Sequence, residues 1–367
     1  MSLSALARFL RSLFEHAGAR VLLTLLLAWA AALLCVALRT PLPWMIGPLL
    51  LTAALSMAGG PTASWTPLRN LGQWTIGGAL GLYFTPQVVQ LLAGFWWAIG
   101  LGVVWALALG LVFGAWLYRV HAGPGALQVA GLTRTTAYFA SPIGSASEMT
   151  QLGERHGART DLIASAHSLR VLLVTLVIPF GLQWAGLHGL DTSLPGPRLL
   201  SWPGLALWVL LTGLGCWAML RLKWANPWFI GALTASLLLT ASGANLSSLP
   251  PGWVNAAQLV IGISLGVRFT PDFVQLAPRW LGSVALATLV MIGLGAGFAG
   301  LLSQFVNLHW ATLLLSTSPG GVAEMAITAK VLQLGVPVVT AFHVMRVAAV
   351  LLLTEPIYRF WYQRRNH

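Results

Sequence analysis

Long apolar runs separated by short polar loops cover the chain from about residue 20 to residue 358. Most runs approach the roughly 20 residues that an α-helix needs to cross a bilayer. Alternation of apolar and polar residues over strand lengths, which would indicate a barrel, is absent from the sequence. Only helices and closed barrels satisfy their backbone hydrogen bonds inside lipid. The pattern therefore predicts an all-α integral membrane protein.

Composition strengthens this prediction and narrows the partners. Hydrophobic residues make up 57% of the 367 residues and charged residues only 8%, whereas soluble proteins carry about 25% charged residues. The mean hydropathy is +0.80. A net charge of +12 would suggest nucleic acid in a soluble protein, but here the basic residues lie in loops between apolar runs, where they set membrane topology. We therefore expect the lipid bilayer as a partner and no nucleic acid.

The strongest sign of organisation is an internal repeat, in which four blocks recur in the same order. Its members are Pro43-Trp44-Met45-Ile46-Gly47 with Pro227-Trp228-Phe229-Ile230-Gly231, Phe84-Thr85-Pro86 with Phe269-Thr270-Pro271, Ser141-Pro142 and Glu148 with Ser318-Pro319 and Glu324, and His167-x-x-Arg170 with His343-x-x-Arg346. Such agreement indicates a duplication. The copies are predicted at 20–182 and 202–358, joined by a linker at 183–201.

Each copy is predicted to contain six helical elements. They are expected near 20–39, 43–59, 68–84, 90–118, 124–157 and 160–182, and near 202–220, 227–243, 253–268, 273–302, 307–334 and 337–355. The fifth element of each copy carries Ser-Pro-x-Gly, and Pro and Gly interrupt a helix. It is either a broken helix that crosses the membrane or a re-entrant hairpin. The first copy has one more residue than the second between Gly144 and Glu148, so we expect the two hairpins not to be equivalent.

The distribution of positive charge favours the hairpin. If all six elements crossed, the loop with Arg221 and Lys223 would lie outside, against the positive-inside rule. With five spans and one re-entrant hairpin per copy, the copies are inverted, and only Arg39 and Arg198 lie outside. The residues then placed inside are Arg8, Arg11, Arg20, Arg69, Arg119, Arg155, Arg159, Arg221, Lys223, Arg268, Arg279, Arg359, Arg364 and Arg365. This arrangement predicts about ten transmembrane helices in two inverted repeats of five spans plus one re-entrant or broken hairpin each, with both termini in the cytoplasm.

Charged residues at membrane depth cost about 2.5–3.5 kcal/mol on insertion scales and so need a reason. Glu148 and Glu324 follow the two hairpin breaks, where the N–H groups of a new half-helix are unpaired. Each glutamate either caps its half-helix or takes part in a transport site as a proton or ion carrier.

A histidine and an arginine share one helix face in each copy, His167 with Arg170 and His343 with Arg346. Each arginine either binds an anionic substrate, pairing with a glutamate of the other copy when substrate is absent, or forms a fixed pair that locks the fold. The histidines are either proton relays or hydrogen-bonded core imidazoles.

The sequence holds no Ser-His-Asp arrangement, P-loop or zinc-ligand spacing. We therefore predict no enzyme, no cofactor and no metal site. Cys35 and Cys216 lie inside apolar runs and are expected to be small core residues.

The paired Pro-Trp-x-Ile-Gly, Phe-Thr-Pro and Ser-Pro-x-Gly blocks resemble those of the AbrB-type membrane protein family over nearly the whole chain. The resemblance implies a link to the superfamily of cation–proton antiporters and anion transporters, whose folds use inverted repeats with discontinuous helices. The labels attached to the family, ammonia monooxygenase and membrane regulator, imply an enzyme or an effect on gene expression. The residues offer no oxygenase site and nothing to contact DNA, so any regulation would be indirect.

These observations predict a multi-pass protein of the bacterial inner membrane that moves a small anionic solute by alternating access, with H⁺ or Na⁺ as the coupling ion and a homodimer as a candidate assembly. A membrane-embedded sensor or regulator is the alternative. The candidate substrate-binding residues are Ser141, Pro142, Gly144, Glu148, Arg170, Ser318, Pro319, Gly320, Gly321, Glu324 and Arg346, and the candidates for proton or ion coupling are Glu148, Glu324, His167 and His343.

Overall fold

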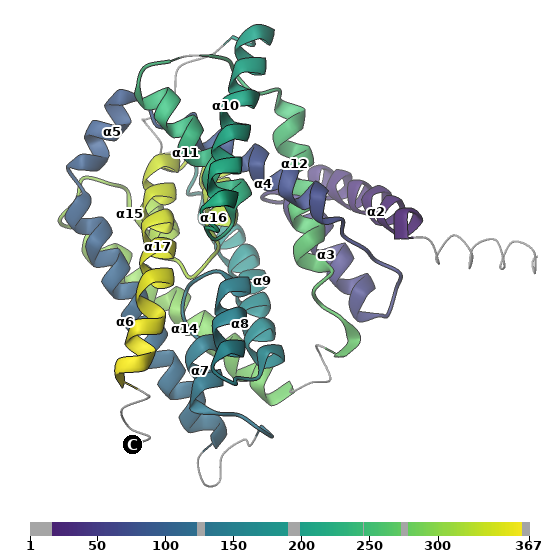
Figure 1. Ribbon diagram of the computed structural model, residues 1–367, viewed down its shortest axis with the longest axis vertical. Helices are drawn as coiled ribbons and strands as arrows, with labels where there is room; N and C mark the ends of the chain where they lie inside the picture. The colour runs from purple at the N-terminus through teal and green to yellow at the C-terminus, as the bar shows by residue number, and fades with distance from the viewer. Residues whose placement is uncertain (1–16, 123–128, 190–198, 245, 273–277, 362–367) are drawn as a thin grey trace, which may run out of the picture. The chain divides into compact units, whose positions relative to one another are not determined.

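The computed structural model describes residues 17–122, 129–189, 199–244, 246–272 and 278–361, and over these ranges it contains helices and no strand (Figure 1). Six of the described helices are long and apolar enough to cross a membrane. They are α2 (Ala17–Ala37), α6 (Trp96–Ala122), α9 (Thr160–Trp184), α10 (Trp202–Arg221), α14 (Pro278–Leu302) and α17 (Val336–Trp361). The prediction of an all-helical membrane protein is therefore confirmed.

The remaining described helices are shorter. They are α3 (Pro43–Met57), α4 (Thr66–Gly81), α5 (Pro86–Ala93), α7 (Arg134–Ala140), α8 (Ala146–Arg155), α11 (Pro227–Ala241), α12 (Pro251–Gly266), α15 (Trp310–Thr317) and α16 (Val322–Leu332). One expected element, 90–118, is in fact two helices, because Thr85 caps α5 through the Val88 N–H and α5 ends at Gly94. The other expected elements match within a few residues, and each fifth element is divided where Ser-Pro-x-Gly predicted a break.

The chain forms two compact units, and each unit contains segments of both predicted copies. Unit 1 comprises 1–81, 198–236 and 245–276, and therefore holds α2, α3, α4, α10, α12 and most of α11. Unit 2 comprises 82–197, 237–244 and 277–367, and holds α5 to α9 and α14 to α17. The linker lies largely within 190–198, outside the described residues, as do Arg8, Arg11, Arg198, Arg364 and Arg365.

Helices of unit 1 exchange equivalent contacts between the copies. A Cβ built on Gly77 of α4 would collide with the backbone oxygen of Phe229 in α11, and one built on Gly262 of α12 would lie 2.5 Å from the backbone oxygen of Met45 in α3. Gly262 stands 185 residues after Gly77, and Phe229 stands 184 after Met45. Glycine thus lets the third helix of each copy press on the second helix of the other.

Unit 2 is built around two helical hairpins. In the first, the Arg159 N–H beyond α8 donates to Oγ1 of Thr136 near the start of α7, at 3.1 Å. In the second, a Cβ built on Gly335 beyond α16 would lie 2.5 Å from Cγ2 of Thr312 near the start of α15. Because the chain leaves each pair of half-helices beside the point where it arrived, α7–α8 and α15–α16 fold back as hairpins and are not broken crossing helices.

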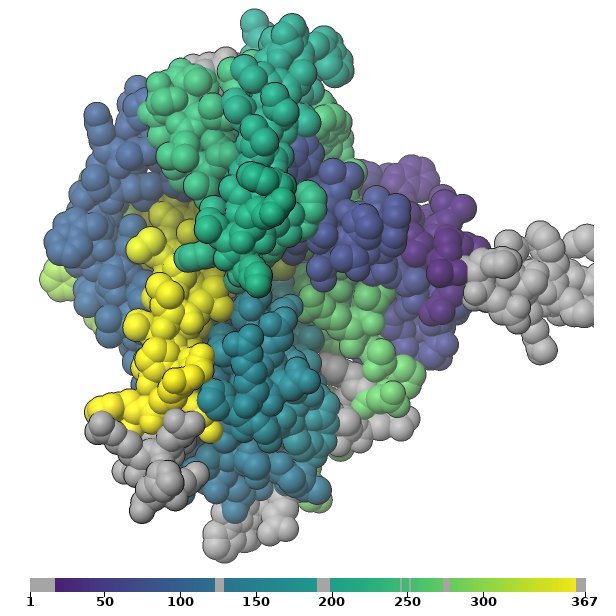
Figure 2. All heavy atoms as spheres, in the orientation of Figure 1, coloured from purple at the N-terminus to yellow at the C-terminus, as the bar shows by residue number. Residues whose placement is uncertain are grey.

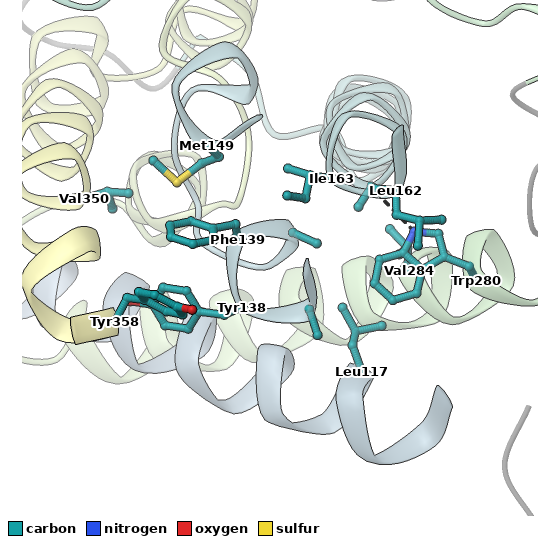
Figure 3. Packing of buried hydrophobic residues seen from close by; sticks show 13 residues of the cluster. Leu117, Tyr138, Phe139, Met149, Leu162, Ile163, Trp280, Val284, Val350 and Tyr358 are labelled. Carbon is teal, nitrogen blue, oxygen red and sulfur yellow. Dashed lines mark hydrogen bonds between the residues drawn. The ribbon is translucent and has the colours of Figure 1, made fainter. Parts of the chain in front are cut away.

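The first hairpin is fixed by an apolar cluster that draws on four helices of unit 2 and includes Phe139 of α7, Met149 of α8, Ile163 of α9 and Val350 of α17, all fully buried (Figure 3). In the space-filling view the side chains of α8, in teal, lie beside those of α17, in yellow (Figure 2). This packing holds the hairpin in place against the long helices that carry the candidate arginines.

Candidate functional site

The two hairpins are equivalent position by position. The second half-helices have their N-caps at Ser145 and Gly321, which are 321 − 145 = 176 residues apart. The same spacing separates Thr136 from Thr312 and His167 from His343. The expectation of an extra residue in the first hairpin was therefore wrong. The Ser-Pro pair instead lies one position later in the second hairpin, so the sequence match is displaced while the backbones correspond.

Each hairpin tip rests on the long helix of the other copy. A Cβ built on Gly144 would lie 2.8 Å from Cγ1 of Val350 in α17, and a Cβ built on Gly320 would lie 2.9 Å from Cγ1 of Val174 in α9. Val174 and Val350 each stand four residues after an arginine, one helical turn along the same face. The two tips therefore meet the faces that carry Arg170 and Arg346.

Arg170 binds the break of its own hairpin. Its guanidinium donates to the backbone oxygen of Ser141 at 3.0 Å and to that of Pro142 at 2.8 Å. The side chain is 4% exposed, and its Nε–H is buried without a partner among the described residues. The positive charge thus satisfies carbonyl groups that the end of α7 leaves unpaired.

Arg346 does the same in the second hairpin with a different set of acceptors. It donates to the backbone oxygen of Ser318 at 2.6 Å and to that of Gly320 at 2.5 Å. It is likewise 4% exposed, and its Nε–H is also buried and unpaired within the described structure. The two guanidinium charges lie close enough to repel each other. The duplication therefore brings two buried positive charges to one region of unit 2.

The histidines differ more than their sequence context suggests. His167 Nε2 lies 3.0 Å from the backbone oxygen of Phe139, and its Nδ1 lies 2.6 Å from the Arg170 guanidinium, so both ring nitrogens are engaged. His343 Nε2 lies 2.8 Å from the backbone oxygen of Leu315, but its Nδ1 is buried and has no partner among the described residues. With Nε2–H as donor, each ring is neutral and Nδ1 is an acceptor. The geometry supports hydrogen-bonded core imidazoles, with one acceptor left open in the second copy.

The glutamates occupy the same turn of the two second half-helices. Neither α8 nor α16 has a side-chain hydrogen bond at its N-cap, and Glu148 and Glu324 lie in their first turns. A Cβ built on Gly321 would overlap the Glu324 carboxylate, which therefore folds back over the start of α16. Glu324 is 8% exposed, whereas Glu148 is half-buried. A carboxylate at this position stabilises a helix N-terminus.

Sequence reasoning missed the residues that anchor the hairpins from outside. Oγ of Ser141 donates to the backbone oxygen of Gly110 in α6 at 2.7 Å, and Oγ1 of Thr317 donates to that of Gly295 in α14 at 3.4 Å. Ser141 was a candidate substrate ligand, yet its hydroxyl is engaged in this anchor. The spacing of 176 that relates Ser141 to Thr317 was available in the sequence, but the Ser-Pro match drew attention to Ser318 instead.

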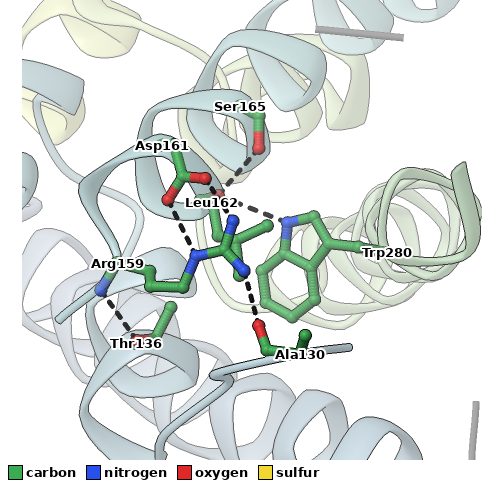
Figure 4. A network of polar contacts seen from close by, with 7 residues as sticks. All are labelled: Ala130, Thr136, Arg159, Asp161, Leu162, Ser165 and Trp280. Carbon is green, nitrogen blue, oxygen red and sulfur yellow. Dashed lines mark hydrogen bonds and ion pairs between the residues drawn. The ribbon is translucent and has the colours of Figure 1, made fainter. Parts of the chain in front are cut away.

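A polar network at the base of the first hairpin has no equivalent in the second. Arg159 pairs with Asp161 and donates to the backbone oxygen of Ala130 at 2.5 Å, while Trp280 Nε1 donates to the backbone oxygen of Leu162 at 3.2 Å (Figure 4). At the same end, Tyr138 OH donates to the backbone oxygen of Thr354 in α17 at 2.8 Å. These bonds secure the base of the first hairpin. Within the described residues, no three His, Cys, Asp or Glu side chains gather as they would at a metal ion.

Comparison with known proteins places the whole arrangement in a wider group. A family model described as "Transition state regulatory protein AbrB" matches residues 44–362. The chain is 26% identical over 333 residues to "Putative regulator AbrB" of Escherichia coli (strain K12), covering 88% of this chain and 91% of that protein. It is 24% identical over 349 residues to "Uncharacterized protein YhjN" of Bacillus subtilis (strain 168), covering 86% of each chain. No solved structure matches this chain.

Proposed function

Because the chain belongs to the family described as "Transition state regulatory protein AbrB" and is a helical membrane protein, we propose that it is a secondary transporter that moves a small organic anion with protons by alternating access. The observation that carries this proposal is the reciprocal seating of the two hairpin tips, Gly144 on Val350 and Gly320 on Val174. Discontinuous helices from two repeats that meet beside buried charges are the usual construction of a transport site.

The proposed topology has ten spans in two inverted repeats. The five spans of each copy are α2, α3, α4, α6 and α9, and α10, α11, α12, α14 and α17. An odd number of spans between equivalent points reverses the orientation of the second copy. The paired contacts of Gly77 and Gly262 support a two-fold relation within unit 1, and those of Gly144 and Gly320 support one within unit 2. With the inside-facing arginines, this places both termini in the cytoplasm and the protein in the inner membrane.

Charge balance suggests how protons take part. The two hairpins contribute two arginines and two glutamates, so the empty site is neutral overall. An isolated charge inside the membrane is costly, and an added anion would leave the site with excess negative charge. Protonation of Glu324 removes that excess and frees the N-terminus of α16 for the anion. We therefore assign proton coupling to Glu324, with Arg170 and Arg346 as positioning residues that hold the tips.

The different bonding of the two arginines suggests the conformational step. Arg170 contacts its neighbouring histidine, whereas Arg346 bonds one position further around its hairpin and leaves the His343 Nδ1 open. In related repeats, two such arrangements of one element represent its two states. On this account the opposite-facing state exchanges them: Arg346 donates to His343 Nδ1, and Arg170 releases His167.

The proposal is tested in proteoliposomes loaded with a pH-sensitive dye and exposed to gradients of small organic anions such as succinate, malate, citrate and glutamate. Proton entry that follows one of these gradients, and that is absent with Glu324→Gln protein of normal folding, supports transport. If an anion raises the melting temperature of the protein and yet none moves across the membrane, transport is ruled out for that ligand.

That second result would favour a membrane-embedded sensor or regulator. The family description and the name of the E. coli relative both use the word regulator. A sensor would use the same hairpin site for binding but would need no exchange of states across the membrane. Flux is therefore the measurement that separates the two functions.

A further inference from the structure

Unit 1 carries an apolar groove that the proposed transport function does not use. Two adjoining hollows between α4 and α12 share Leu68 and Val260 as walls. The larger encloses about 650 Å³, part of it open to the surface, and extends past Gly72 to Trp253. The smaller encloses about 210 Å³ and reaches Arg69. Together they form one continuous groove along the crossing of the two helices.

The length and lining of the groove match one acyl chain. Along α12 it runs from Trp253 to Ile263, which is about 15 Å of helix. This is about half of the ~30 Å hydrocarbon thickness of a bilayer, the depth of a single leaflet. Its floor consists of small residues, including Gly72 and Ala257, and Ala256 on its rim is exposed. An open apolar groove at this depth will be filled by a lipid tail unless another apolar partner covers it.

One end of the groove is positively charged and lacks counter-ions. Arg69 lines the smaller hollow, and Arg20 directly precedes its wall residue Val21. The Nε atoms of both arginines are shielded from solvent and have no hydrogen-bond partner among the described residues, although Arg20 also donates to the backbone oxygen of Thr62 at 3.2 Å. Neither 17–81 nor 246–271 contains an Asp or Glu. The negative charge that these arginines require must therefore come from outside those segments.

We propose that this groove binds an anionic phospholipid, with the headgroup phosphate at Arg20 and Arg69 and one acyl chain lying between α4 and α12. Guanidinium groups match phosphate oxygens in a two-bond geometry. Basic pockets between helices on the cytoplasmic side are typical sites for anionic headgroups, and both arginines lie inside in the topology proposed above. Trp65, 56% exposed beside the charged end, is placed to anchor at the headgroup level.

The site is tested by native mass spectrometry of the full chain with dioleoyl phosphatidylglycerol or dioleoyl phosphatidylcholine. Wild type should bind phosphatidylglycerol more tightly, and Arg20→Gln and Arg69→Gln should each weaken that binding about fivefold, the factor that corresponds to about 1 kcal/mol per basic residue. Ala256→Trp, at an exposed position on the groove, should weaken both lipids. The matched controls are Arg221→Gln, an arginine that lies over Trp217, and Leu210→Trp on exposed α10. Neither control should change binding.

Three results would overturn the proposal. Equal binding of the two lipids by wild type would remove the headgroup preference. Stabilisation by inorganic phosphate that depends on the arginines but not on Ala256 would assign the charged end to a free anion. A dimer that Ala256→Trp dissociates, with lipid binding unchanged, would assign the groove to a second copy. None of these outcomes depends on transport, so the lipid site and the proposed function fail separately.

Discussion

Gly144 at the tip of the first hairpin packs against Val350, one helical turn beyond Arg346 of the other copy. The equivalent contact joins Gly320 to Val174, one turn beyond Arg170. Each hairpin is thus held at its break by an arginine of its own copy and seated at its tip on the other copy. A movement of either tip must therefore be felt by the helix that fixes the other break.

The tip contact predicts a specific coupling between two residues. Gly144→Ala should destabilise the protein by about 1–3 kcal/mol, because its new Cβ would press on Val350 in a packed core. Val350→Ala should cost less in that background than in wild type, with a coupling energy of about 1 kcal/mol in a double-mutant cycle of thermal unfolding. Gly181→Ala is the matched control, since a Cβ there meets nothing within 4 Å. Additive effects of the two substitutions would contradict the contact.

The arginines are predicted to stabilise the hairpins before they serve any solute. Arg346→Gln should leave the carbonyl groups of Ser318 and Gly320 without their donors, at about 1–3 kcal/mol for each buried group. Arg170→Gln should act similarly on the first hairpin. Arg221→Gln, which removes an exposed cation lying over Trp217, should cost at most about 0.5–1 kcal/mol. The melting temperatures in detergent measure the difference, and equal losses for buried and exposed arginines would contradict the capping role.

The histidines provide a test of the asymmetry between the copies. His167→Phe removes two hydrogen bonds and His343→Phe removes one. The first substitution should therefore cost about 1 kcal/mol more than the second, the net value of an average hydrogen bond. Thermal unfolding of the two variants in the same detergent measures this. A greater loss for His343→Phe would show that its open Nδ1 has a partner in the working protein.

Glu324 is predicted to separate proton coupling from solute movement. Glu324→Gln keeps the shape of the side chain and imitates its protonated form, so exchange of anion across the membrane should continue while proton-driven accumulation is lost. Exposed Glu154, in the same unit, gives the matched control Glu154→Gln, which should leave both activities unchanged. Proton-driven accumulation at the wild-type level in Glu324→Gln would remove this residue from coupling.

Much of this fold follows from the sequence because membrane helices are set by apolar length and by breaks at Pro and Gly. The division of the fifth elements was visible in Ser-Pro-x-Gly, and the paired His-x-x-Arg motifs pointed to the correct helices. The register of the second hairpin was not visible, because Ser318 resembles Ser141 in sequence while Thr317 takes its place in space. Local similarity cannot reveal which side chain reaches Gly110 or Gly295.

The acceptors of the arginines were also beyond the sequence. Opposite charge suggested Glu148 and Glu324 as partners, but the guanidinium groups bond to backbone oxygens at the hairpin breaks. Such acceptors are present at every residue, so composition gives no signal for them. They become identifiable only when the chain folds back and exposes unpaired carbonyl groups within reach of a buried cation.

The inverted arrangement of the two hairpins is tested most directly by labelling one cysteine at the base of each. The background carries Cys35→Ser and Cys216→Ser, and the exposed reporter sites are Glu154→Cys beside the first hairpin and Asn307→Cys before the second. A membrane-impermeant maleimide is applied to right-side-out and to inside-out vesicles. The account predicts that the cysteine at 154 reacts only from the cytoplasmic side and the cysteine at 307 only from the opposite side. Reaction of both from the same side would contradict it.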